Sequence, residues 1–335
     1  MQKLKPILDN EWNQVCEFNR NILADFLENS TEKSPKTLKA YESNLRIWFN
    51  WVRENLGNKE QTAIRPIEFK RFQNWLVNRG CSSADCANKR AAISSLNNYI
   101  TIYYSDEFPM FHNFINASIA RPPKVAVHEK NPLTKDEFAH LIEVLTERQE
   151  WQKIAYLKFT LETGCRKAGS RQILKSVVDA TPIVKTKTTI DADGNETVRT
   201  VKYYQTHKCR EKGRGVQGKT KIYQFGEDTM MALKRWLDHR GEDDCPYMFV
   251  TKHMGSIKQV SENTFNGWCT NDFSSIVGRP VWPHLIRSSR ATQLVVEDGV
   301  DIKVAQKLLG HENASTTEIY VVRDDTDDLD DLYLA

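Results

Sequence analysis

The sequence predicts a mainly α-helical protein with a small antiparallel β-sheet, built as a helical bundle followed by an α+β domain. Three observations lead to this. Apolar residues recur at helical spacing through most of the 335-residue chain. Between about residues 184 and 225 the pattern changes to Thr-, Val- and Tyr-rich runs typical of strands. A stretch with three prolines and no helical period, residues 120–132, separates the two parts as a linker would.

The first 120 residues predict a small helical bundle. Ser34 and Pro35 form a good cap and first-turn pair. The helix that they open carries apolar residues on one face, namely Leu38, Tyr41, Leu45, Trp48, Phe49 and Val52. A second helix is expected from Pro66 to Gly80, and a third over about residues 84–103. The inward residues of the third are Ile93, Leu96, Ile100 and Tyr103. The aromatic stripe is most simply explained as core.

The linker is expected at residues 121–132, between a domain of residues 1–120 and one of residues 133–322. Thr134 and Glu137 form a capping box that opens a helix. A further apolar helix follows over residues 151–161 and delivers Arg166 just after its end.

The strand-like segment predicts a hairpin and one more strand. Residues 184–190 and 197–206 flank Asp-Ala-Asp-Gly-Asn at 191–195, which is a turn signal. A strand over residues 221–225 is expected to close the sheet. From Glu227 onward the pattern predicts helices again.

Composition restricts the class of protein. The net charge of +3 is mildly basic, so any nucleic-acid footprint must be local. No apolar run reaches eighteen residues, and the start lacks the apolar core of a secretory signal. The seven cysteines are scattered, odd in number and without a CxxC pair, which favours reduced thiols over a zinc site or disulfides. We therefore expect a cytoplasmic protein with no membrane partner.

The candidate chemistry lies in a few polar residues of the second domain. His284 and Arg287 are three apart, so on a helix they share a face. His311 follows Leu-Leu-Gly, a typical helix end, and Tyr320 lies nine residues further on. Arg166 upstream supplies a second guanidinium group. Two such groups can hold both non-bridging oxygens of a phosphate, and a phenol can attack the phosphorus. No acidic cluster near these motifs resembles a magnesium site.

The pattern Arg166 … His284-x-x-Arg287 … Gly310-His311 … Tyr320 resembles the signature of the tyrosine recombinases, the phage integrase, Xer and Cre family. Residues 300–311 and 316–320 resemble that family almost position by position. The resemblance implies an N-terminal core-binding domain and a catalytic domain that form a C-shaped DNA clamp. It also implies a bacterial or phage-encoded, nucleoid-associated enzyme.

The resemblance implies site-specific recombination of double-stranded DNA through a 3′-phosphotyrosyl intermediate. The enzyme would work as a homotetramer on two sites, without cofactor, metal or ATP, and accessory proteins are left open as further partners. In the implied mechanism Tyr320 attacks the phosphate, while Arg166 and Arg287 hold its oxygens. His284 assists as a base and His311 donates to a phosphate oxygen.

The general acid would be a lysine of the basic segment between residues 206 and 222. Lys208 is the first choice, because it follows the preceding strand as the family lysine does in Cre-like enzymes. Lys212 and Lys219 remain alternatives.

The remaining basic residues are candidate DNA contacts. They are Lys36, Lys39, Lys89, Arg90, Arg210, Lys212 and Arg214. In the alternative interpretation they form solvated faces and a solvated loop. The acidic tail, residues 323–335, ends in an apolar cluster and is expected to dock on a neighbouring protomer, with a solvated acidic end as the alternative.

One position departs from the family. An acidic residue usually stands three after the first arginine, where this chain has Gly169. Glu162 or a residue from the sheet are both open as substitutes. The departure also keeps a DNA-binding protein with a vestigial site as an alternative, beside a type IB topoisomerase or a telomere resolvase.

Overall fold

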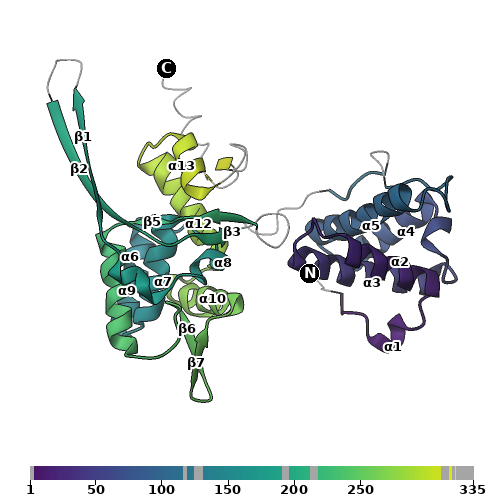
Figure 1. Ribbon diagram of the computed structural model, residues 1–335, viewed down its shortest axis with the longest axis horizontal. Coiled ribbons are helices and arrows are strands. Elements are labelled where there is room, and N and C mark those ends of the chain that lie inside the picture. The colour runs from purple at the N-terminus through teal and green to yellow at the C-terminus, as the bar shows by residue number, and fades with distance from the viewer. Residues whose placement is uncertain are drawn as a thin grey trace. The chain divides into compact units, whose positions relative to one another are not determined.

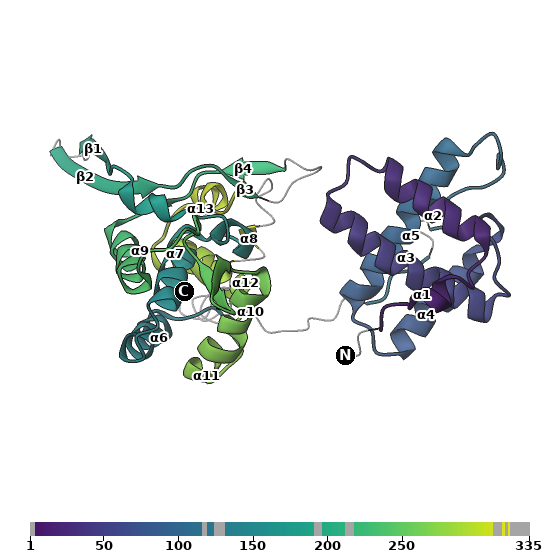
Figure 2. The same ribbon diagram turned by 60° about the horizontal axis from the view of Figure 1, so that its bottom comes forward.

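The computed structural model describes residues 4–115, 119–123, 131–190, 196–211, 218–310, 317–318 and 321. The chain divides into two compact units, one mainly of residues 1–129 and the other mainly of residues 130–335. Both are drawn in Figures 1 and 2, and each is considered by itself. The fold is mostly helical with small antiparallel sheets, as the sequence predicts. None of the described helices combines the length and the apolar character needed to cross a membrane.

The regular elements in the described part of the N-terminal unit are all helices. Its elements are α1 (Asp9–Trp12), α2 (Glu17–Asn29), α3 (Pro35–Asn55), the 3-10 turn η1 (Gln61–Ala63), α4 (Pro66–Asn78) and α5 (Ser83–Tyr103). Ser34 caps α3, since its hydroxyl accepts from the Thr37 amide at 3.2 Å. The three predicted helices are therefore confirmed, but the expectation that Tyr103 faces inward is wrong, because it is 70% exposed at the end of α5.

The aromatic stripe of α3 is the core of this unit, as predicted. Trp48 is fully buried, stacks on Trp51 at 5.7 Å and meets Phe72 edge-on at 4.8 Å. Its indole donates to the Gln61 side chain at 2.8 Å, and Gln61 donates to Asn97 at 2.6 Å. The indole of Trp48 and the side chain of Gln61 thus find partners at the centre of the bundle.

The C-terminal unit begins with α6 (Lys135–Glu147), α7 (Trp151–Thr163), α8 (Lys167–Ser170) and η2 (Lys175–Asp179). Its strands are β1 (Ile183–Ile190), β2 (Glu196–Gln205), β3 (Cys209–Glu211), β4 (Lys219–Lys221), β5 (Gln224–Phe225), β6 (Val250–His253) and β7 (Ser256–Gln259). Its later helices are α9 (Glu227–Arg240), α10 (Glu262–Gly267), η3 (Trp268–Phe273), α11 (Ser274–Val277), α12 (Pro283–Thr292), η4 (Gln293–Glu297) and α13 (Ile302–Leu309). Thr134 caps α6 with the predicted capping box.

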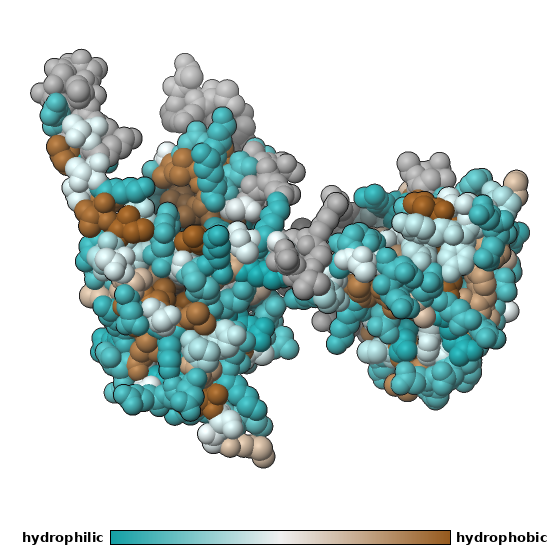
Figure 3. Space-filling model, in the orientation of Figure 1, coloured by the Kyte–Doolittle hydropathy of each residue, from teal (hydrophilic) through white to brown (hydrophobic). Residues whose placement is uncertain are grey.

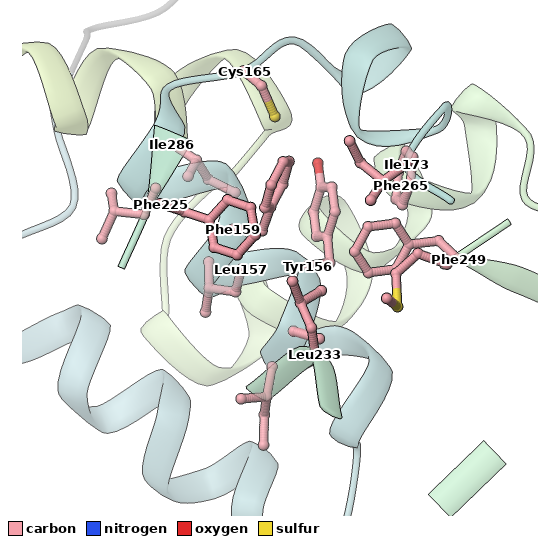
Figure 4. Packing of buried hydrophobic residues seen from close by; sticks show 14 of the residues in the cluster. Tyr156, Leu157, Phe159, Cys165, Ile173, Phe225, Leu233, Phe249, Phe265 and Ile286 are labelled. Carbon is pink, nitrogen blue, oxygen red and sulfur yellow. The ribbon is translucent and has the colours of Figure 1, made fainter. Parts of the chain in front are cut away.

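Helix α7 contributes Tyr156, Leu157 and Phe159 to the hydrophobic core of this unit, and most of its residues are buried (Figure 4). Tyr156 stacks on Phe265 at 4.3 Å, and Phe159 packs against Phe225 at 5.6 Å. Its charged residues are only partly buried, and two of them form ion pairs, Lys153 with Asp272 and Lys158 with Asp228.

The sheet begins with the predicted hairpin. β1 pairs antiparallel with β2 from Ile183 opposite Tyr203 to Ile190 opposite Glu196. In Figure 1 this hairpin extends away from the rest of its unit, and Figure 3 shows hydrophobic residues along it. Val184, Val198 and Val201 are exposed there.

The expectation of a single strand over residues 221–225 is wrong. β4 pairs with β3, whereas β5 pairs with β2, so the segment serves two different partners. Tyr223 lies between them, where its amide donates to the Thr206 hydroxyl at 3.0 Å. The chain changes its pairing partner from β3 to β2 at Tyr223, so the strand is interrupted there.

The expectation that only helices follow Glu227 is also wrong, because β6 and β7 form a hairpin. Met254 and Gly255 connect them, and both have positive φ, 48° and 77°. Positive φ at both turn residues is the backbone of a tight two-residue hairpin turn. Met-Gly is an unusual sequence for such a turn, so the signal was weak.

Candidate active site

The turn after α7 positions Arg166. Gly164 ends the helix in the left-handed conformation with φ 57°. A Cβ added to Gly164 would lie 2.6 Å from Cδ2 of Leu309, so only glycine allows this close approach. Two residues later Arg166 caps α8. The C-terminal end of α7 is thereby packed against the end of α13.

Helix α12 carries His284 and Arg287, as predicted. Pro283 opens the helix, and the exposed His284 lies in its first turn. Arg287 is completely buried and donates to two backbone carbonyls, those of Gly164 and, at 2.6 Å, of Leu309. One guanidinium therefore ties together the segment that leads to Arg166 and the segment that leads to His311.

Helix α13 ends at Gly310 in the left-handed conformation with φ 67°, which confirms the predicted helix end. His311 and Tyr320 lie outside the described residues, as do Lys212, Arg214 and the tail 323–335. Their roles remain predictions.

Lys221 on β4 is a further candidate residue that the motif pattern does not include. Its ammonium donates to the carbonyl of Leu308 and lies 5.0 Å from the centre of the Tyr223 ring. Burial lowers its pKa, Glu211 raises it and Arg287 lowers it again, to about 8. The alternation in the sequence is only a partial signal for it. Lys221 ends β4 and is half-buried, whereas Tyr223 and Phe225, which follow at alternate positions, are buried.

The lysines that were proposed as general acid are placed differently. Lys208 follows β2 and is exposed, and Lys219 at the start of β4 is exposed as well. The described structure thus brings Lys221, and not Lys208 or Lys219, among the buried groups around Arg287.

Glu211 on β3 is the carboxylate that meets Arg166. The guanidinium of Arg166 donates from Nη1 to Oε2 of Glu211, and Tyr223 donates its phenol proton to Oε1 at 2.5 Å. Burial raises the pKa of Tyr223, so its phenol stays a neutral donor. Glu162 is engaged elsewhere, since it accepts from the Gly226 amide at 2.8 Å. Of the two substitutes that were open, the residue from the sheet contacts the arginine.

The expectation that Lys89 faces outward toward DNA is wrong. Lys89 is only 3% exposed, and its ammonium pairs with Asp85 at 2.6 Å. The physical reason lies in the helical period. Lys89 precedes the inward-facing Ile93 by four residues and shares its face. Its neighbour Arg90 is half-buried, donates to Gln73 at 3.2 Å and lies over the Phe69 ring.

Three of the other candidates are at the surface. Lys36 and Lys39 are exposed on the first turns of α3, and Arg210 is exposed on β3. Within the part of the chain that the structure describes, no group of three or more metal-ligating side chains comes together.

Two family models and a curated relative match most of the chain. The model of the phage integrase family matches residues 131–327, and that of the phage integrase N-terminal SAM-like domain matches residues 23–101. The SPbeta prophage-derived recombinase-like protein YomM of Bacillus subtilis (strain 168) is 32% identical over 96% of this chain and 92% of its own length.

Solved structures share the fold at low sequence identity. The Tn1549 transposon integrase in complex with transposon right end DNA has a TM-score of 0.65 at 14% identity, covering 92% of this chain and 96% of that one. The XerH site-specific recombinase bound to palindromic difH substrate has a TM-score of 0.63 at 17% identity, covering 97% and 87%. The chain therefore belongs to the phage integrase family, the tyrosine recombinases, and is a DNA strand-transferring enzyme.

Proposed function

We propose that the protein is a site-specific DNA recombinase that cuts and rejoins double-stranded DNA through a 3′-phosphotyrosyl intermediate. It works without metal or ATP, as a homotetramer on two sites. The observation that carries this proposal is the pair of bonds from Arg287 to the Gly164 and Leu309 carbonyls. They join the three motif segments of the sequence at one place, beside Lys221. The names of the relatives and their DNA complexes support the same function.

The chemistry needs a nucleophile, positive charge around the phosphorane and a proton for the leaving oxygen. The Tyr320 oxygen attacks the phosphorus, and the bond to the 5′-oxygen breaks. His284 takes the phenol proton, a lysine ammonium protonates the leaving oxygen, and His311 donates to a phosphate oxygen. The 5′-hydroxyl of the second strand then attacks the phosphotyrosyl link and releases Tyr320. Each step exchanges one phosphoester for another, so no ATP is consumed.

The positive charge comes from the protein in this scheme. Arg166 and Arg287 neutralise the non-bridging oxygens, which is the work that a metal ion does in other phosphoryl-transfer sites. Exposed cations, among them Lys36, Lys39 and Arg210, contact DNA phosphates and contribute affinity more than sequence choice.

A nicked suicide duplex taken from the DNA beside the gene tests the proposal. The nick lets the short strand leave after cleavage and traps the covalent intermediate. We expect a protein–DNA adduct on a denaturing gel with the natural chain, in excess EDTA as well, and none with Tyr320→Phe. Binding of the variant should be nearly unchanged, because one hydroxyl adds little contact area.

Two results contradict the proposal. An adduct with the Tyr320→Phe variant removes Tyr320 from its role, and cleavage that requires added magnesium removes the metal-free mechanism. Strand exchange between two intact duplexes separates a recombinase from a topoisomerase, which would relax supercoils without exchanging strands.

A further inference from the structure

We propose that Glu211 is the positioning carboxylate of Arg166 and takes the place of the acid that is missing at Gly169. Tyr223 holds Glu211 and closes the space that the usual acid would need. This inference rests on the proposed function, because it assigns Arg166 to the scissile phosphate. Glu211 is a positioning residue, since it acts through Arg166.

Both carboxylate oxygens of Glu211 are engaged by donors from different parts of the fold. Oε2 accepts from Arg166, which caps α8, and Oε1 accepts from Tyr223 at 2.5 Å. Glu211 is 7% exposed and Tyr223 1% exposed. Charge-assisted hydrogen bonds are about twice as strong as neutral ones, and they orient a planar guanidinium group well. Glu211 therefore restricts the directions in which Arg166 can present its remaining donors.

The backbone around Glu211 is itself attached to the segment that carries Arg166. The side chain of Gln172, just after α8, accepts from the Arg210 amide at 2.8 Å and donates to the Arg210 carbonyl at 2.8 Å. These paired bonds hold β3 against the end of α8. Arg166 and Glu211 are thus positioned by neighbouring, mutually attached elements, although 45 residues separate them.

Gly169 and Tyr223 exclude any acid at the usual position. A Cβ built on Gly169 would lie 2.1 Å from the Tyr223 hydroxyl oxygen and 2.8 Å from Cζ. No side chain at residue 169 can coexist with this ring, because both distances are far inside van der Waals contact. The arrangement here and the usual one are therefore alternatives: a carboxylate enters either from residue 169 or from β3.

The position of Glu211 also links the arginine to Lys221. β3 and β4 form one antiparallel ladder, with Cys209 opposite Lys221 and Glu211 opposite Lys219. The charged and titratable groups that act on Lys221 are Glu211 from β3, Arg287 from α12, and Cys165 and Arg166 from the turn after α7. Glu211 raises the pKa of Lys221 against the lowering effect of burial. Removal of its charge should lower that pKa further.

The test is the single-turnover cleavage rate of Glu211→Gln on the nicked duplex at saturating protein. We expect a loss of about 10–100-fold, with DNA affinity within twofold of the natural chain. If Lys221 is the general acid, the alkaline limb of the pH–rate profile should also move to lower pH, an effect that loosened packing does not produce. Glu162→Gln is the matched control, a neutralised glutamate of α7 that bonds the Gly226 amide and should change neither readout.

Moving the carboxylate from residue 211 to residue 169 tests whether Tyr223 excludes an acid at the usual position. The triple variant Gly169→Asp, Tyr223→Leu, Glu211→Gln should regain at least a tenth of the natural rate, whereas Gly169→Asp alone should lower the cleavage rate. If Glu211→Gln fails to fold by circular dichroism, Tyr223→Phe replaces it. That change keeps the ring and removes one bond to Glu211, and it should slow cleavage severalfold.

The outcomes are distinguishable. An unchanged rate and pH profile in Glu211→Gln, or in a folded Tyr223→Phe when the former does not fold, overturns the role of Glu211. A natural chain that forms no adduct through Tyr320 overturns the proposed function instead.

Discussion

Hydrogen bonds within the C-terminal unit orient its two motif arginines. Arg287 is bonded to two carbonyls, and Arg166 to one carboxylate, so both guanidinium groups are oriented before DNA arrives. A guanidinium group has five N–H donors in a rigid fork, so arginine can bond the protein and a phosphate at the same time, and lysine cannot replace it. Lys221 and Lys208 differ in burial. Lys221 is half-buried near Arg166 and Arg287, whereas Lys208 is exposed.

The two lysines can be compared by leaving-group chemistry. A general acid contributes about 10²–10⁴-fold to cleavage of an ordinary phosphodiester and almost nothing when the leaving atom is a thiolate. We predict that Lys208→Ala slows the ordinary substrate and that a 5′-bridging phosphorothiolate restores the rate. Lys221→Ala, Lys212→Ala and Lys219→Ala are measured in parallel on the same two substrates.

If the sulfur substrate rescues Lys221→Ala and not Lys208→Ala, the role of general acid passes to the buried lysine. Rescue at Lys212 or Lys219 would assign it there. An ammonium with a pKa of about 8 also loses its proton as pH rises through 8. Cleavage that depends on Lys221 should then decline above that pH.

Exposed and buried lysines of the N-terminal unit should behave differently toward DNA. Lys36→Ala and Lys39→Ala should each weaken binding similarly across sequences and lower the slope of log K against log salt by about 1. Lys89→Ala is the comparison, because its ammonium already pairs with Asp85 inside the bundle. It should lower the melting temperature and leave the salt slope unchanged. A lowered slope for Lys89→Ala would return it to the DNA contacts.

Among the elements, the C-terminal end of α7 positions Arg166. Gly164 lets α7 stop in a left-handed turn directly against Leu309 of α13, and Arg287 of α12 bonds both residues. Three helices therefore meet at one point, two residues before Arg166.

Gly164→Ala tests that junction. The new methyl group meets Leu309 at 2.6 Å in addition to the strain of positive φ, so we expect destabilisation by about 2–4 kcal/mol. Gly278→Ala is the matched control. It caps α11 at φ 77° with nothing within 4 Å, and should cost about 1 kcal/mol. Urea unfolding of both variants measures the difference, and equal losses would show that the contact with α13 is unimportant.

The whole molecule consists of two units with separate hydrophobic cores, one in the helical bundle and one around α7. The division at residues 121–132, the clamp around DNA and the tetramer remain predictions. The acidic tail is the segment through which assembly can be tested. Its apolar residues Leu329, Leu332, Tyr333 and Leu334 are too few to form a core of their own.

Deletion of residues 329–335 should weaken assembly more than chemistry. Each tail side chain buried on a neighbour contributes about 1.5–3 kcal/mol, less the cost of ordering the segment. We predict fewer tetramers and slower recombination of two sites, with nicking of a single site much less affected. Sizing of protein–DNA complexes measures this. Unchanged tetramers with the truncated chain would mean that the tail is a solvated acidic end.

The sequence by itself determined the elements whose signals are local. The Ser34 cap, the Thr134 capping box, the β1–β2 hairpin and the glycine stop at Gly310 all lie where caps, periods and turn residues place them. The shared face of His284 and Arg287 follows from spacing alone. These features depend on residues a few positions apart, so a linear pattern contains them.

Only the tertiary structure decided which polar groups meet. Glu211 reaches Arg166 across 45 residues, Arg287 reaches Leu309 across 22, and Tyr223 occupies the space beside Gly169. The physical reason is that a hydrogen bond depends on distance through space, which helix and strand periods do not encode for remote segments. Burial has the same dependence, because it depends on what packs over a face. Lys89 lies on an inward face that the helical period indicates, whereas the partial burial of Lys221 comes from the groups that pack around it.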